Sequence, residues 1–242
     1  MSEEEKENKP KGNPVMDMLD KVLVGARKFL EEQKLLKMVD ELSYLAIRKT
    51  VDFLKGTFIP MKIEGNENVP DFKPAILTTI ADQPIDMFLV TALSPRKIHL
   101  MLPYKMFQTP GLKPLLESIG AYRSTKDKDD MEPIQQTLHL LNEKQDLVAM
   151  IPIDDGEREK LVKTFGGGIV KIASGVGVPI IPYVSTPLKY FKLGKEMKFN
   201  IGEPIMVKSR LSRDERYAIA NDMVDKLLKM KEDLRDKPEE EE

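Results

Sequence analysis

Cysteine is absent from this sequence of 242 residues, which excludes disulfide bonds and thiol chemistry and fits a reducing compartment. Long apolar runs are also missing, because no stretch reaches the length of roughly 18–20 residues that a helix needs to span a bilayer. Neither sign of charge dominates, since 38 Lys and Arg stand against 40 Asp and Glu, so nucleic acid is not expected as a partner. We therefore expect a cytoplasmic globular protein whose membrane contact, at the inner face of the cell membrane, is at most peripheral.

Histidine, the usual general base of enzymes, is nearly absent. The chain has only His99 and His139, and the residues five positions further on are Tyr104 and Lys144. No His-x4-Asp pattern therefore exists anywhere in the sequence. His99 alternates with apolar residues on a predicted strand, and His139 lies between leucines in a predicted helix, so both are expected to be structural.

The two ends of the chain differ in composition from its middle. Residues 1–14 and 235–242 are polar and acidic, which predicts disordered tails, and the first of them does not resemble a signal peptide. Apolar residues recur at helical spacing through 15–60. This N-terminal segment is predicted to form amphipathic helices that either pack over the domain, the favoured interpretation, or lie at a membrane surface.

Residues 61–234 alternate between short apolar runs and helical patterns, which predicts an α/β domain with a mostly parallel sheet flanked by helices. The run at 75–80 is continuously apolar, as expected for a strand that is covered on both faces. The predicted strands are 61–65, 75–80, 97–102, 147–153, 178–184 and 198–201, with 120–122 extended, and the predicted helices are 86–93, 111–118, 131–143, 168–174 and 211–234.

Two local signals concern helix starts. Ser212 followed by Glu215 predicts a capping box at the start of the last helix. The run Gly166–Gly168 is predicted to precede the helix at 168–174. That run could cradle an anion at a helix N-terminus, although a packing role is favoured.

Several segments carry a resemblance in collinear order. They are IEGNENVP (63–70), ADQPID (81–86), KIHLMLPYKMFQTPGLKPLLESIGAYR (97–123), AMIPIDDGER (149–158), FGGGIVKIASGVGVPIIPYVST (165–186) and FNIGEPI (199–205). Together they resemble the glycerolipid acyltransferase family of the 1-acylglycerol-3-phosphate type. The resemblance implies that family's fold and transfer of an acyl group to lysophosphatidic acid or a related glycerol phosphate lipid. Acyl-CoA or an acyl-carrier thioester would be the co-substrate, with no cofactor and no metal.

The resemblance also implies roles for single residues. The family's histidine base falls on Ala81, and the aspartate that orients it falls on Asp86. Without a histidine, Asp86 could instead cap the helix that begins beside it. Asp82, the other catalytic candidate, could act as a carboxylate base if Asp86 raised its pKa, or could be a solvated turn residue.

The remaining candidates concern the substrate. By motif position, Arg123 and Arg158 would bind the acceptor's phosphate, with surface ion pairs as the alternative. Gly156 would allow the backbone to approach the substrate closely, and Asp155 takes the position of the family's glutamate. Asp154 and Asp155 could bind a cation, but exposure to solvent is the simpler interpretation.

These assignments leave the activity open between two hypotheses. The first, which the resemblance favours, is an acyltransferase with changed chemistry, and the alternative is a non-catalytic member of the same fold that binds a lipid or an acyl thioester. A helical adaptor with an α/β scaffold is a third, less favoured class. Because each motif follows a predicted strand, we expect the segments 81–86, 120–123 and 155–158 to converge on one cleft.

Overall fold

The computed structural model describes residues 60–236, except 110, 128 and 188–195. The predicted acidic tail at 1–14, the helical segment at 15–60 and all but the start of the tail at 235–242 lie outside the described residues. No helix among those described is long and apolar enough to cross a membrane.

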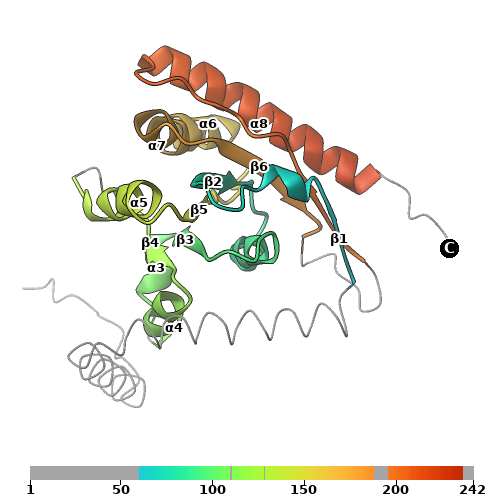
Figure 1. Ribbon diagram of the computed structural model, residues 1–242, viewed down its shortest axis with the longest axis horizontal. Helices are drawn as coiled ribbons and strands as arrows, with labels where there is room; N and C mark the ends of the chain where they lie inside the picture. The colour runs from blue at the N-terminus through green and yellow to red at the C-terminus, as the bar shows by residue number, and fades with distance from the viewer. Residues whose placement is uncertain (1–59, 110, 128, 188–195, 237–242) are drawn as a thin grey trace, which may run out of the picture.

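A seven-stranded sheet with the order β1-β7-β6-β2-β5-β3-β4 runs through the described part of the chain (Figure 1). All neighbouring strands are parallel except β6 and β7, which are antiparallel. The prediction of an α/β fold with a mostly parallel sheet is therefore confirmed. The strands are β1 (Met61–Glu64), β2 (Ala75–Thr78), β3 (Ile98–Leu102), β4 (Tyr122–Arg123), β5 (Leu147–Met150), β6 (Ile180–Ser185) and β7 (Met197–Ile201).

The centre of the sheet is formed by strands that are apolar along their whole length. Every residue of β2 and β5 is buried, and β2 lies between β5 and β6. A strand covered on both faces has no solvent side on which to place polar residues, which explains the continuous apolar run in the sequence. The polar Thr78 is accommodated because its hydroxyl donates to the carbonyl oxygen of Met150, 2.7 Å away.

Helices cover both faces of the sheet, and each face has its own apolar cluster (Figure 1). The first cluster lies under the 3-10 helix η2 (Pro84–Ala92) and the short helix α4 (Leu112–Ser118), beside α3 (Tyr104–Phe107). The second lies under four helical elements on the other face. These are α5 (Glu132–Asn142), α6 (Arg158–Thr164), α7 (Val170–Val176) and the long C-terminal helix α8 (Arg213–Asp236).

The glycine run differs from its prediction. Residues Gly166–Gly168 lie within η3 (Phe165–Ile169), a π-helical turn that joins α6 and α7 into one continuous helical segment. The N–H groups of a helix interior are bonded within the helix, so the alternative of an anion cradle at a helix N-terminus is not realised. The run serves packing instead, because a Cβ at Gly166 would lie 3.3 Å from Cγ of Tyr217 and 3.5 Å from Cβ of Ala220, both on α8.

This close approach predicts different effects for the same substitution at two glycines. Gly166→Leu should lower the free energy of unfolding by about 1–3 kcal/mol, because the new side chain must push α8 away. Gly168→Leu is the control, since a Cβ there meets nothing within 4 Å. Chemical denaturation should show the loss at position 166 only, and equal losses at both positions would contradict the packing role.

The start of α8 agrees with the sequence. Ser212 accepts a hydrogen bond through Oγ from the N–H of Glu215 at 3.2 Å, and Glu215 accepts one through Oε2 from the N–H of Ser212 at 2.7 Å. The predicted capping box is confirmed. The sequence patterns did not predict α3 or α6, and most other element boundaries lie within a few residues of their predicted positions.

Candidate functional site

The candidate residues follow strands at the carboxyl edge of the sheet. β2 and β5 are neighbours, and beyond their ends Ala81 forms an isolated parallel bridge with Ile153. The N–H of Ala81 donates to the carbonyl oxygen of Pro152 at 2.9 Å, and the N–H of Asp154 donates to that of Ala81 at 2.8 Å. Backbone hydrogen bonds therefore fix the segment after β2 against the segment after β5.

Ala81 offers no group that can accept a proton. Its side chain is 2% exposed and belongs to the first apolar cluster. His99 does not lie beside Ala81 in the sheet. Across the strands His99 pairs with Val148, and Val148 pairs with Ile76, so His99 is level with Ile76. Ala81 is five residues further along the chain than Ile76, a distance of about 16 Å for extended backbone.

Both histidines have structural contacts away from this edge. The ring of His99 lies between the carbonyl oxygen of Gly120, 3.1 Å from Nδ1, and Oδ2 of Asp146, 3.2 Å from Nε2. Burial lowers the pKa of His99, and Lys97 lowers it further, against the opposing effect of Asp146. His139 forms an ion-pair contact with Glu143 one helical turn away on α5. The expectation that neither histidine is the base agrees with these positions.

Asp86 has a cap contact at the start of η2. Its side chain is among the buried polar groups, at 6% exposure, and its Oδ2 accepts a hydrogen bond from the N–H of Gln83 at 3.1 Å. The Gln83 side chain completes a capping box with the N–H of Asp86. Burial raises the pKa of Tyr183, and the charge of Asp86 raises it further. The alternative of Asp86 as a helix cap is therefore realised, and its catalytic role stays a prediction.

Asp82 is not a solvated turn residue. Its carboxylate forms an ion pair with Nζ of Lys231, and NH2 of Arg235 lies 3.5 Å from Oδ2. Lys231 also donates to the carbonyl oxygen of Ile80 at 3.1 Å. The side chains of Asp82 and Lys231 are only 9% and 11% exposed. Lys231 therefore attaches the last turns of α8 to the segment after β2, through the two residues that flank Ala81 in the sequence.

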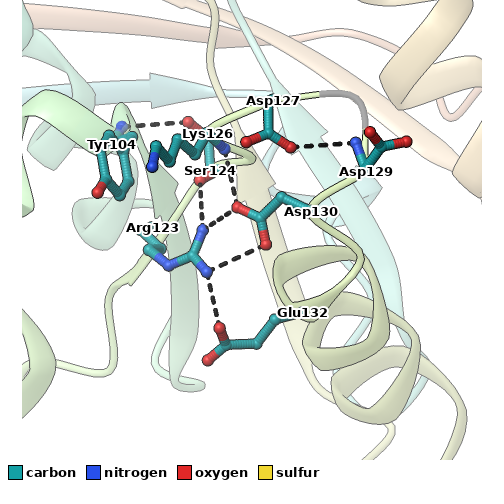
Figure 2. A network of polar contacts seen from close by, with 8 residues as sticks. All are labelled: Tyr104, Arg123, Ser124, Lys126, Asp127, Asp129, Asp130 and Glu132. Atoms are coloured by element: carbon teal, nitrogen blue, oxygen red, sulfur yellow. Dashed lines mark hydrogen bonds and ion pairs between the residues drawn. The ribbon is translucent and has the colours of Figure 1, made fainter.

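Arg123 lies at the centre of a polar network, shown in Figure 2. Its two terminal nitrogens contact the two carboxylate oxygens of Asp130, and NH2 also donates to Oε2 of Glu132 at 2.7 Å. The guanidinium lies 5.6 Å from the ring centroid of Tyr104. The hydrogen bonds that Asp130 accepts from Arg123 lower the pKa of its carboxyl group to about 2. The hydrogen bonds that Arg123 donates to Asp130 and Glu132 raise the pKa of its guanidinium.

The segment after β5 has internal partners as well. Arg158 donates from NH1 to Oδ1 of Asn221 at 2.9 Å and from NH2 to Oδ1 of Asp225 at 2.6 Å, both on α8. Asp155 forms an ion pair with Lys160, which is the main cause of the lowered pKa of its carboxyl group. Gly156 has a φ of 83°, and open space surrounds the position of a Cβ.

The convergence of the three segments on one cleft stays a prediction. They share one edge of the sheet, because parallel strands end there. η2, which carries Asp86, packs with the first cluster beside α3 and α4, whereas Arg158 bonds to α8, which covers the second cluster.

A metal site finds no support here. No group of three or more acidic or histidine side chains that could hold a metal ion occurs in the described ranges. Oδ1 of Asp154 accepts the N–H of Gly156 at 3.0 Å, and Asp155 is paired with Lys160. The suggestion that Asp154 and Asp155 bind a cation therefore gains nothing from the geometry.

Sequence reasoning missed Lys231 and Asp130. Lys231 is 149 positions from its partner Asp82, and only the packing of α8 across the sheet brings them together. Asp130 is seven positions from Arg123, within one acidic segment, so proximity in the sequence was a usable signal.

Comparisons with known proteins agree with the fold. The crystal structure of PlsC, the 1-acyl-sn-glycerophosphate (LPA) acyltransferase of Thermotoga maritima, is similar with a TM-score of 0.55 and 17% sequence identity. The match covers 92% of this chain and 91% of that chain, and at this identity it supports the fold alone. A search of the curated proteins gave no match. Residues 60–186, more than half of the chain, match the family described as Acyltransferase, and the chain therefore belongs to the Acyltransferase family.

Proposed function

We propose that this chain is a glycerolipid-type member of the Acyltransferase family that binds an acyl thioester or acyl lipid and does not transfer the acyl group through a histidine base. The observation that carries the proposal is Ala81. It is a buried methyl group at the strand end where the resemblance places the base, and both histidines lie elsewhere.

The chemistry of acyl transfer supports this choice. A hydroxyl that attacks a thioester must lose its proton to a positioned base, which typically contributes about 10²–10⁴-fold in rate. Asp86 has no imidazole to orient, and one of its carboxylate oxygens already accepts a backbone N–H. Without the base, binding energy can hold a substrate but gives no route for this proton.

The ligand class follows from the family and from the resemblance. We propose acyl-CoA or an acyl-carrier thioester as one ligand, and lysophosphatidic acid or a related glycerol phosphate lipid as the other. PlsC of Thermotoga maritima is named for the second of these lipids. Peripheral contact with a membrane is part of the proposal, because such lipids reside there.

Family membership favours a second candidate, an active acyltransferase with a different base. Asp82 follows Ala81 directly in sequence and lies one helical turn before Asp86, and this position made it the candidate for that role. Its ion pair with Lys231 argues against it, because a base must offer a free lone pair to the substrate hydroxyl. Asp82 would have to exchange Lys231 for the substrate at every turnover.

Calorimetric titration tests the binding proposal. Palmitoyl-CoA, kept below its micelle concentration, should bind measurably tighter than CoA, because only the acyl chain can bury apolar surface. Ala81→Gln, which places bulk at the carboxyl edge, should weaken that binding, whereas Gly168→Leu, on the helical segment of the opposite face, should not. Equal affinity for palmitoyl-CoA and CoA would reject the ligand class.

A further inference from the structure

The terminal nitrogens of Arg123 are occupied by two carboxylates of the same chain, those of Asp130 and Glu132. Tyr122 packs into the second cluster, so Arg123, the next residue of β4, points to the face of α3. There it lies over the ring of Tyr104, the first residue of α3. A planar guanidinium held against an aromatic ring has its remaining donors directed sideways, where a two-point acceptor fits.

Asp130 is that two-point acceptor. Its Oδ1 and Oδ2 contact the two terminal nitrogens of Arg123, which is the paired arrangement that a phosphate would also adopt. A backbone contact helps to hold the Asp130 carboxylate in place, because its Oδ2 also accepts a hydrogen bond from the N–H of Lys126 at 2.9 Å. The side chain of Asp130 is 13% exposed and that of Arg123 26% exposed, so the contact is sheltered but reachable from solvent.

Glu132 completes the neutralisation. It contacts NH2 of Arg123 from the first turn of α5, and its side chain is 77% exposed. One arginine therefore faces two carboxylates, as Figure 2 shows. An incoming dianion would meet an excess of negative charge unless one of these carboxylates left or was neutralised.

We propose that Asp130 is an internal competitor for the phosphate of an acceptor lipid, so that Arg123 is an anion site in a self-occupied state. The inference rests on the proposed function, in which glycerol phosphate lipids are ligands. In this state a phosphomonoester binds Arg123 only in the fraction of molecules in which Asp130 has released it. If the pair is formed about nine-tenths of the time, the apparent affinity is about tenfold below that of the open site.

The test is equilibrium binding of glycerol 3-phosphate, followed by ligand-observed NMR, with glycerol as the uncharged reference. Asp130→Asn should raise the affinity for glycerol 3-phosphate about tenfold over wild type, because the amide keeps an acceptor for the Lys126 N–H and loses the charge. Adding Arg123→Gln to that variant should remove the gain. Glu132→Gln, at a more exposed position, should give a smaller gain in the same direction.

The matched control is Glu143→Gln, which also removes one exposed negative charge but lies beside His139 at the other end of α5, away from both candidate arginines. An equal gain in this control would overturn the proposal, because the effect would then reflect net charge. The proposal would also be overturned if neither Asp130→Asn nor Glu132→Gln raised the affinity for glycerol 3-phosphate. Palmitoyl-CoA and CoA carry the same phosphates, so the difference between their affinities does not depend on phosphate binding at Arg123. The internal competitor can therefore fail while the proposed function stands, and the proposed function can fail while the competitor stands.

Discussion

Lys231→Met is expected to lower the free energy of unfolding by about 3 kcal/mol. The substitution leaves the carboxylate of Asp82, 9% exposed, without its ammonium partner, and removal of one member of a sheltered ion pair typically costs in this range. It also removes the hydrogen bond to the carbonyl oxygen of Ile80. Chemical denaturation monitored by circular dichroism measures the change.

Two further variants separate the ion pair from other effects. Lys229→Met makes the same change at an exposed position of α8 and should alter stability by no more than about 0.5 kcal/mol. Asp82→Asn combined with Lys231→Met should recover most of the loss, because the carboxylate that lost its ammonium partner is then neutral. A Lys231→Met protein as stable as Lys229→Met would show that the contact does not attach α8 to the end of β2.

Ala81→His is expected to restore no acyl transfer and to cost about 1–3 kcal/mol of stability. Ala81 is 2% exposed within the first cluster, so an imidazole must displace its neighbours. Asp86, its expected partner, is already engaged in the capping box of η2, where it accepts the N–H of Gln83. Denaturation and an assay of thioester release from palmitoyl-CoA measure the two effects.

Ala81→Gln provides the comparison, because it adds similar bulk without a base. Both variants should be destabilised and neither should release CoA above the wild-type level. A rise of about 10²–10⁴-fold in Ala81→His alone would mean that the site lacks only its histidine, and the proposal of a binding protein would have to be withdrawn.

Much of the fold was predictable because its signals are local. The continuous apolar runs became β2 and β5, and the Ser212–Glu215 pattern became a capping box. The helical segment at 158–176 was missed in its first half because the glycines Gly166–Gly168 resemble a turn. Only the contact with α8 explains why the chain remains helical there.

The candidate site was less predictable because its state depends on partners that are distant in the sequence. Motif position identified Arg123 and Arg158, and adjacency to Ala81 identified Asp82, but the partners of all three are set by tertiary packing. Lys231 and Asp225 come from α8, which joins the edge only after it has crossed the second face of the sheet. Asp86 was assigned two alternatives, and the hydrogen bond from Gln83 favours the cap.

The charged candidates share one property that the sequence did not reveal. Asp82, Arg123, Asp155 and Arg158 each face an opposite charge within the chain. Substrate binding through any of them requires an exchange of partners. This arrangement agrees with a protein that binds the apolar acyl chain of its ligand. The pairing of Arg123 with Asp130 is then one of four such internal ion pairs among the candidates.

Thioester release by the wild-type protein tests the central claim most directly. Palmitoyl-CoA and lysophosphatidic acid are incubated with the protein at several pH values between about 5 and 9. An ordinary carboxylate is deprotonated throughout this range, and an ordinary imidazole becomes deprotonated within it. CoA release is followed alongside palmitoyl-CoA binding on the same preparation. The account predicts binding without release above the buffer rate at any pH. Release that depends on the protein and on lysophosphatidic acid would contradict it. Loss of that release in an Asp82→Asn protein that circular dichroism shows to be folded would identify an acyltransferase with a carboxylate base.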